Sequence, residues 1–392
     1  MSSFKYTLEA VTAPGSNQIP GAVVIAADRS GDIIDLQAVG VTSVDPINRR
    51  PMTEDTTFWI ASCTKLITTV AALQCVERGQ LALDEDVSTI LHELNSPDVL
   101  VGFDAQSGEP TLRKSQERIT LRQLLTHSSG NMNDLLSPEI KKWRPWQKPA
   151  LNDDDGEIVK RFLTPLLFEP GHGWVYGGGL DWAGRMVERV NGGIRLGDYF
   201  KKHIFEPLGM RSTGFRPSEN ESIRESLSAT TVRTPTGELV GATPFPPANP
   251  KDDLGGGGLY TAPKDYIKVL IALLQNKGTL LKPETVDMMF APQLPDSKYL
   301  EAVVNPERGV MYRSGVDSRQ WNFGLGGILN MEDVEGVCKK GTMTWGGLPN
   351  LFWWIDRTAG TCGMYASQLL PPSDATSMQI ALEFRKSIAR RS

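Results

Sequence analysis

The sequence is poor in the residues from which metal sites and disulfide frameworks are built. Its 392 residues include only four cysteines and four histidines. The cysteines form no C-x-x-C pair, and three of the histidines, His92, His172 and His203, share no spacing typical of metal ligands. We therefore expect neither a zinc site nor a disulfide framework, and no metal or other cofactor.

Long apolar runs and an excess of positive charge are also missing. No run approaches the roughly 18 apolar residues of a membrane span, and the first residues, MSSFKYTLEAV, lack the pattern of a signal peptide. With 41 basic against 46 acidic residues, the net charge is −5 and no basic run is present. We therefore expect no membrane or nucleic-acid partner, and a protein of a reducing compartment, the cytoplasm.

Short apolar runs predict strands near both ends of the chain, with helical patterns between them. Tight turns separate the expected strands, which are 21–28 and 33–41 in the first part and 351–356 and 361–369 in the last. Apolar residues at helical spacing favour helices at 63–78, 119–125, 157–167, 181–190, 266–275 and 374–390. This arrangement predicts an α/β domain built from both termini, 1–78 and 310–392, and a mostly helical domain, 79–309, with the active site between the two.

One pair of residues at the start of the helix 63–78 suggests a nucleophile and its base. Ser62 and Lys65 are three positions apart, a spacing that places two side chains on the same face of a helix. A serine hydroxyl needs a neighbouring base to become a good nucleophile, and a lysine with a depressed pKa can serve. The helix N-terminus also offers unpaired N–H groups to a developing oxyanion. The motif is short and arises often by chance, so it needs support from elsewhere.

Two glycine-rich stretches could complete such a site. Tyr176 lies in PGHGWVYGGG, residues 170–179, where its phenol could accept and donate a proton; taken alone, it is better explained by packing beneath the loop. Trp345-Gly346-Gly347 precedes the strand 351–356. A main-chain N–H there could join that of Ser62 as an oxyanion donor, or the glycines could form an ordinary turn.

In this order, S-x-x-K, the tyrosine and W-G-G resemble the motifs of the serine β-lactamase-related superfamily of penicillin-recognising enzymes. Two further stretches are similar to its segments, LLTHSSG at 124–130 and GGGGLYT at 255–261. The closer resemblance is to the fungal branch that contains the lovastatin-type acyltransferases (simvastatin synthase) and related esterases. It is carried by IPGAVV at 19–24 and WVYGGGLDWAG at 174–184, among others.

The resemblance implies a β-lactamase/transpeptidase-like α/β fold, with an antiparallel sheet flanked by helices and a mostly helical insertion. It also implies a ping-pong mechanism in which Ser62 is the acyl nucleophile, Lys65 its base and Tyr176 the relay that protonates the leaving group. The N–H groups of Ser62 and Leu348 would be the oxyanion donors. The substrate would lie against Trp174, Trp345, Gly346 and Gly347.

The sequence departs from the superfamily pattern at two positions. The asparagine of its Y-x-N motif is Gly178 here, and its K-T-G motif is replaced by W-G-G. These changes remove an amide contact to the substrate carbonyl group and a cation for a substrate carboxylate. Both favour esters or thioesters over β-lactam or D-Ala-D-Ala substrates, and Trp345 favours an apolar acyl or alcohol group.

The leading hypothesis is therefore acyl transfer to a hydroxyl of a polyketide-type small molecule. The donor would be an acyl thioester, with an acyl carrier protein as one candidate carrier. The alternative is a carboxylesterase that hydrolyses such an ester; a β-lactamase or peptidase and a non-catalytic binding protein are less favoured.

Three other features have simpler explanations. The Leu-rich surroundings of His127 are typical of a structural histidine, and Cys63, turned away from Ser62 by helical spacing, is expected to pack in the core. The four glycines at 255–258 lack the Lys-Ser/Thr of a phosphate loop, and indicate a hinge or a wall of the site.

Overall fold

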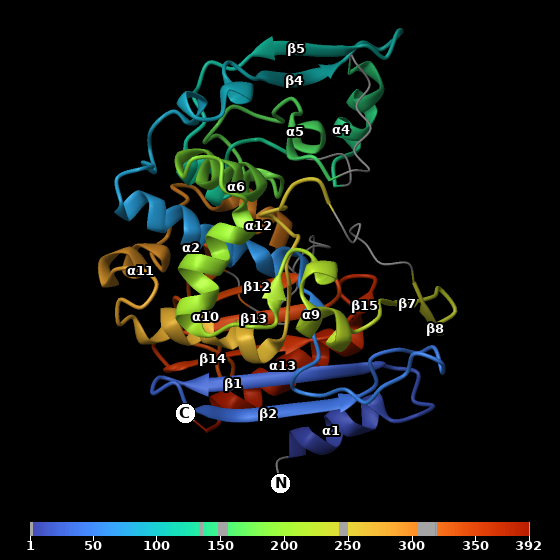
Figure 1. Cartoon of the computed structure of the whole chain (residues 1–392). Helices are drawn as coiled ribbons and strands as arrows, with labels where there is room; N and C mark the ends of the chain where they lie inside the picture. Colours follow the sequence, from blue (N-terminus) through green and yellow to red (C-terminus); the bar gives the residue numbers. More distant parts are fainter. Residues whose placement is uncertain are drawn as a thin grey trace.

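The chain forms a seven-stranded antiparallel sheet from its two ends. The computed structural model describes residues 3–132, 136–147, 156–242, 250–304, 318 and 320–391. The strand order is β10-β11-β12-β13-β14-β1-β2, and Figure 1 shows the N-terminal strands in blue beside the C-terminal strands in orange and red. The strands are β1 (Gly21–Asp28), β2 (Ile33–Gly40), β10 (Trp321–Phe323), β11 (Ile328–Asn330), β12 (Met343–Gly347), β13 (Leu351–Asp356) and β14 (Thr361–Ala366).

Helices cover both faces of this sheet, which explains why β1 is apolar along its whole length. Val24 packs with Phe4 of α1 (Ser3–Thr12) and Phe384 of α13 (Ala375–Ala389). Its neighbours Val23 and Ile25 belong to the larger core, which also contains the apolar residues of α10 (Pro263–Gln275). Because side chains alternate along a strand, a strand buried on both faces needs apolar residues at every position.

The remaining helices and short strands lie outside the seven-stranded sheet. Two of the longer helices, α2 (Thr64–Glu77) and α6 (Gly179–Val190), pack against each other. The shorter helices are α3 (Leu121–Leu125), α4 (Pro138–Trp143), α5 (Ile158–Phe162), α7 (Leu196–Phe200), α8 (Glu206–Leu208), α9 (Glu221–Ser226), α11 (Pro283–Met289) and α12 (Lys298–Val304). The short strands are β3 (Phe58–Trp59), β4 (Asp98–Phe103), β5 (Pro110–Lys114), β6 (Thr213–Gly214), β7 (Thr231–Arg233), β8 (Leu239–Gly241), β9 (Tyr260–Thr261) and β15 (Leu369–Leu370).

The helix predicted at 157–167 is wrong in its second half. The helix α5 ends at Phe162, because Pro165 disfavours a helical conformation at the residue before it. The chain then runs alongside β4: the Leu166 N–H donates to the Asp98 carbonyl, and the Leu100 N–H donates to the Leu166 carbonyl, both at 2.8 Å.

The two-domain division of the chain stays a prediction. The expected boundary at 310 lies outside the described residues. Within the described part, α10 belongs by sequence to the middle segment 79–309 but packs against β1 and β14 of the sheet. The helical segment and the sheet are therefore joined by a shared core rather than by a thin linker.

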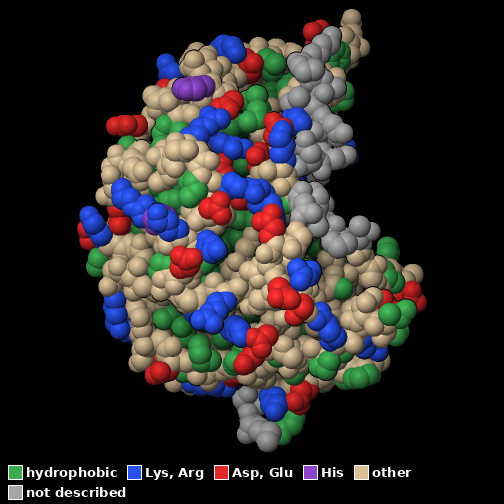
Figure 2. All heavy atoms as spheres, in the orientation of Figure 1, with side chains coloured by type: hydrophobic (Ala, Val, Ile, Leu, Met, Phe, Trp, Pro, Cys, Tyr) green, Lys and Arg blue, Asp and Glu red, His purple; other side chains and the backbone are tan. Residues whose placement is uncertain are grey.

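The surface and the helix lengths give two further observations. Figure 2 shows basic and acidic side chains interspersed over the visible face, in keeping with the small net charge of −5. Among the described residues, none of the helices has the length and apolar character needed to cross a bilayer.

Candidate active site

Ser62 lies in a tight turn immediately before α2. The turn is the 3₁₀ segment η1 (Ala61–Cys63), and Ala61 has a φ of +43°, a region that residues with a Cβ rarely adopt. Buried side chains hold it in place: the Thr64 hydroxyl donates to the Ala61 carbonyl at 2.6 Å, and the Tyr266 hydroxyl donates to the Cys63 carbonyl at 2.8 Å. Such strain is stable only where the surroundings enforce it, and it is common at active sites.

The structure brings Ser62, Lys65 and Tyr176 together. Lys65 Nζ donates to Ser62 Oγ at 3.3 Å, and the Tyr176 hydroxyl is hydrogen-bonded to the same oxygen. Lys65 Nζ also lies 4.5 Å from the centre of the Tyr176 ring. Lys65 and Tyr176 are only 6% and 5% exposed, so both polar groups are directed at Ser62 from within the protein.

The loop of four glycines forms a fixed wall beside the lysine. Its first three carbonyl groups each accept a hydrogen bond: Gly255 from Thr68 at 2.6 Å, Gly256 from Lys65 at 2.5 Å, and Gly257 from Trp59 Nε1 at 2.7 Å. The glycine-rich sequence fits either a hinge or a wall of the site, and these contacts favour the wall.

Asp181, in the first turn of α6, was missed as a candidate. Its carboxylate accepts the Gly256 N–H at 2.9 Å. The available signal was an acidic residue in the first turn of the helix that follows the tyrosine, a position that the helix dipole favours for an anion.

The W-G-G segment is the end of β12, and it packs directly against the turn that carries Ser62. In the described chain, β11 pairs only with Met343 and Thr344 of β12, so residues 345–347 extend beyond that neighbour. A Cβ on Gly347 would overlap the Ile60 carbonyl oxygen and lie 3.3 Å from Cys63 Sγ. Only glycine permits this approach. Leu348 follows directly, at the start of the turn into β13, and is 38% exposed.

Aromatic rings surround Tyr176. The centre of its ring is 5.5 Å from the ring centre of Trp345. The ring centres of Trp345 and Phe323 are also 5.5 Å apart. The ring centres of Trp174 and Phe323 are 5.9 Å apart. The two tryptophans predicted to contact substrate are thus parts of one apolar cluster next to the tyrosine, with exposures of 6% and 3% for Trp174 and Trp345.

Comparison with known proteins establishes the family. The family model described as Beta-lactamase matches residues 8–384. This chain belongs to the β-lactamase family. It is 40% identical to a lovastatin esterase of Penicillium rubens, over 96% of both chains. It is 37% identical to a monacolin J acid methylbutanoyltransferase of Aspergillus terreus, over 95% of this chain and 92% of the relative.

A solved structure agrees with this assignment. The LovD6 mutant of simvastatin synthase from Aspergillus terreus matches with a TM-score of 0.90 at 37% identity, over 99% of this chain and 96% of that one. The expected family and the α/β fold are therefore confirmed. So is the expectation of an enzyme of the acyltransferase and esterase class.

His127 of this β-lactamase-family chain has the contacts of a structural residue. It is buried, with a φ of +60°, and its Nδ1 accepts the Gly177 N–H at 3.4 Å. Burial, and then the charge of Lys65, hold its pKa well below the ordinary value of 6.5. The neutral ring packs 4.7 Å from the ring of Tyr176. Cys63 is also buried, and burial raises the pKa of its thiol, which fits packing rather than reactivity.

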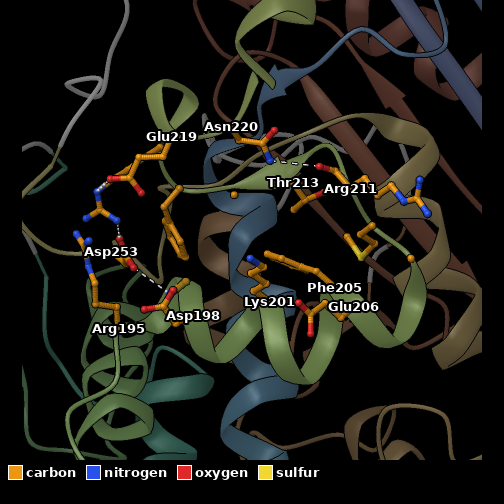
Figure 3. Close-up of a pocket in the computed structure, with 16 residues that line it drawn as sticks. Arg195, Asp198, Lys201, Phe205, Glu206, Arg211, Thr213, Glu219, Asn220 and Asp253 are labelled. Carbon is orange, nitrogen blue, oxygen red and sulfur yellow. Dashed lines mark hydrogen bonds and ion pairs between the residues drawn. The ribbon is translucent and has the colours of Figure 1, made fainter. Parts of the chain in front are cut away.

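A separate hollow of about 570 Å³ lies over α7, α8 and β6 (Figure 3). Its lining includes four basic and four acidic side chains, and two of them, Arg216 and Asp253, form a buried ion pair. Ser62, Lys65 and Tyr176 do not line it. We therefore assign it no part in the chemistry at Ser62.

Proposed function

We propose that this protein is an acyltransferase that forms an ester on Ser62 and passes the acyl group to a hydroxyl of a polyketide-type small molecule. The observation that carries the proposal is the convergence of Lys65 Nζ and the Tyr176 hydroxyl on Ser62 Oγ. A nucleophile with a base and a second proton carrier in contact is the arrangement that covalent acyl transfer needs.

In the first half of the reaction, the amine of Lys65 takes the Ser62 proton while Oγ attacks the acyl carbon of the donor. The resulting oxyanion is stabilised by the N–H groups of Ser62 and Leu348. When the donor is a thioester, the carbon–sulfur bond then breaks. Tyr176 delivers a proton to the leaving thiolate and regains one from Lys65, so that acyl-Ser62 and a free thiol result. An acyl carrier protein is one candidate carrier of that thioester.

In the second half, the hydroxyl of the acceptor attacks acyl-Ser62. Its proton passes to the Tyr176 and Lys65 pair, the bond from Ser62 Oγ to the acyl carbon breaks, and Ser62 is protonated again. If water attacks instead, the product is a free acid, and the protein acts as a carboxylesterase. The 40% identity to a lovastatin esterase supports this second candidate.

The surroundings of the tyrosine support esters and thioesters over β-lactams. A Cβ on Gly178 would overlap the ring of Phe162, so no side chain could take the place of the asparagine amide. The third motif presents Trp345 where a lysine would bind a substrate carboxylate. We infer that Trp174, Trp345, Gly346 and Gly347 line an acyl or alcohol site of apolar character. The name of the relative that acts on monacolin J acid supports a polyketide substrate.

Mass spectrometry of the intact protein with a short acyl thioester or an aryl ester tests the proposal. We expect one acyl adduct on the wild-type protein and none on Ser62→Ala. Absence of an adduct, together with unchanged turnover by Ser62→Ala, would rule out covalent catalysis at this residue. Adding a candidate alcohol then distinguishes the two activities, because a transferase yields the new ester and an esterase yields the free acid.

A further inference from the structure

A chain of contacts links the base Lys65 to a buried carboxylate that does not touch it. Lys65 Nζ donates to the Gly256 carbonyl, and the Gly256 N–H donates to Asp181 Oδ1. The carbonyl of Gly255, in the same peptide group as that N–H, accepts from the Thr68 hydroxyl. The peptide group that precedes the Gly256 carbonyl is thus held from both sides, which restrains the residue whose own carbonyl accepts from Lys65.

The packing around Gly256 shows that Asp181 lies against the loop itself. A Cβ at position 256 would overlap the Asp181 carboxylate, so glycine is required for the two to be this close. Asp181 is 4% exposed and is the acidic residue in the first turn of α6. Burial raises the pKa of Asp181, while Lys65, the Gly256 N–H and Arg161 act in the opposite direction.

The charged and titratable groups around Lys65 come from several elements. Four of them interact with Lys65 itself: Cys63 on its own turn, His127, Tyr176 on the glycine-rich stretch, and Asp181 on α6. Arg161 of α5 acts on Asp181. Burial makes both the charged form of His127 and the thiolate of Cys63 unfavourable. Asp181 is the carboxylic acid of this set, and Lys65, the Gly256 N–H and Arg161 favour its ionised form against the burial that raises its pKa. In that form it can favour a positive charge on Lys65.

We propose that Asp181 is a positioning residue for the base. It orients Lys65 through Gly256, and its negative charge stabilises the ammonium ion that forms when Lys65 takes the Ser62 proton. The arrangement follows the general logic of a nucleophile, a base and a third group that orients the base. The role rests on the proposed function, because it requires Lys65 to act as the base for Ser62.

Asp181→Asn separates the charge of this residue from its geometry. The amide keeps an oxygen that can accept the Gly256 N–H but carries no negative charge, whereas Asp181→Leu has a similar size and loses both. The reaction of each variant with an aryl ester is followed across pH, with rates normalised to the fraction of protein that forms a Ser62 adduct. This normalisation removes the contribution of misfolded protein.

We expect Asp181→Asn to reach a lower plateau of kcat at a lower pH. Loss of the negative charge removes the group that stabilises the ammonium form of the base, which should move the acid limb of kcat/KM down by about one pH unit. The weaker base should reduce the plateau roughly three- to tenfold, with little change in KM. Asp181→Leu should show the same shift and a larger loss of kcat.

Glu188→Gln is the matched control. Glu188 is also a buried carboxylate on α6; it pairs with Arg185 and accepts the Leu196 N–H at 2.9 Å. Its substitution should lower thermal stability and leave the acid limb at the wild-type pH. If Asp181→Asn also leaves the acid limb unchanged while the wild type forms its Ser62 adduct, the role of Asp181 is overturned and the proposed function stands. If the wild type forms no Ser62 adduct, both are overturned.

Discussion

Replacing Gly347 with alanine tests how closely the W-G-G strand packs on the turn of the nucleophile. The added Cβ would overlap the Ile60 carbonyl oxygen and lie 3.3 Å from the buried Cys63 Sγ. The first of these is a backbone atom, so no side-chain rotation can relieve the overlap, and the end of β12 must move away from η1. That movement separates the Ser62 and Leu348 N–H groups. Loss of one oxyanion donor slows a reaction roughly 100- to 1,000-fold, equivalent to about 3–4 kcal/mol.

Steady-state kinetics with an aryl ester, together with thermal denaturation, measure the effect. We expect Gly347→Ala to lower kcat/KM by at least roughly 100-fold, mainly through kcat, and to reduce stability by about 1–3 kcal/mol through overpacking. Gly241→Ala serves as the control, because a Cβ there has nothing within 4 Å. Wild-type kinetics and stability in Gly347→Ala would refute the close packing of strand and turn on which the oxyanion site depends.

Two further predictions concern neighbours of the nucleophile. Tyr176→Phe keeps the ring against Trp345 but removes the hydroxyl that contacts Ser62; we expect kcat to fall roughly 100-fold or more with little change in KM, and an unchanged kcat would exclude the tyrosine as a proton carrier. The pKa of His127 is held well below 6.5 in the folded protein, so below that pH the unfolded chain binds a proton that the folded protein does not. Wild-type stability should therefore fall by up to roughly 1 kcal/mol per pH unit between about pH 6.5 and 5.5 on account of this residue. In His127→Asn, asparagine tolerates the positive φ, and the loss of stability caused by the histidine should be absent when stability is measured by urea denaturation. The same pH dependence in both proteins would contradict a neutral, buried histidine.

The part of the fold that could be predicted is the part with strong local patterns. The strands at 21–28 and 351–356 are apolar runs, and their burial on both faces makes them easy to identify. The hairpin of β4 and β5 was not predicted, because β5 is PTLRK, with four of its five residues exposed. Its pairing depends on partners that the local sequence does not reveal.

The site was predictable only where residues lie in recognisable motifs. Ser62, Lys65 and Tyr176 could be named from spacing and resemblance, and the structure brings their polar atoms together. The hydrogen bond from Lys65 to the Gly256 carbonyl could not be predicted, because Gly256 is 191 positions away in the chain. The 3₁₀ turn before α2 was also out of reach, since nothing in the sequence indicates that Ala61 has a positive φ. Both features arise from tertiary packing rather than from local propensity.

The central claim is that the acyl group passes through Ser62. The most direct measurement is to quench the reaction of wild-type protein with a thioester donor within the first turnover and to map the acylated peptide by mass spectrometry. We expect the acyl group to be on Ser62 and to disappear when an acceptor alcohol is added. Acyl transfer to the alcohol with no acylated Ser62 at any time, or with the acyl group on Lys65 or Tyr176, would contradict transfer through Ser62.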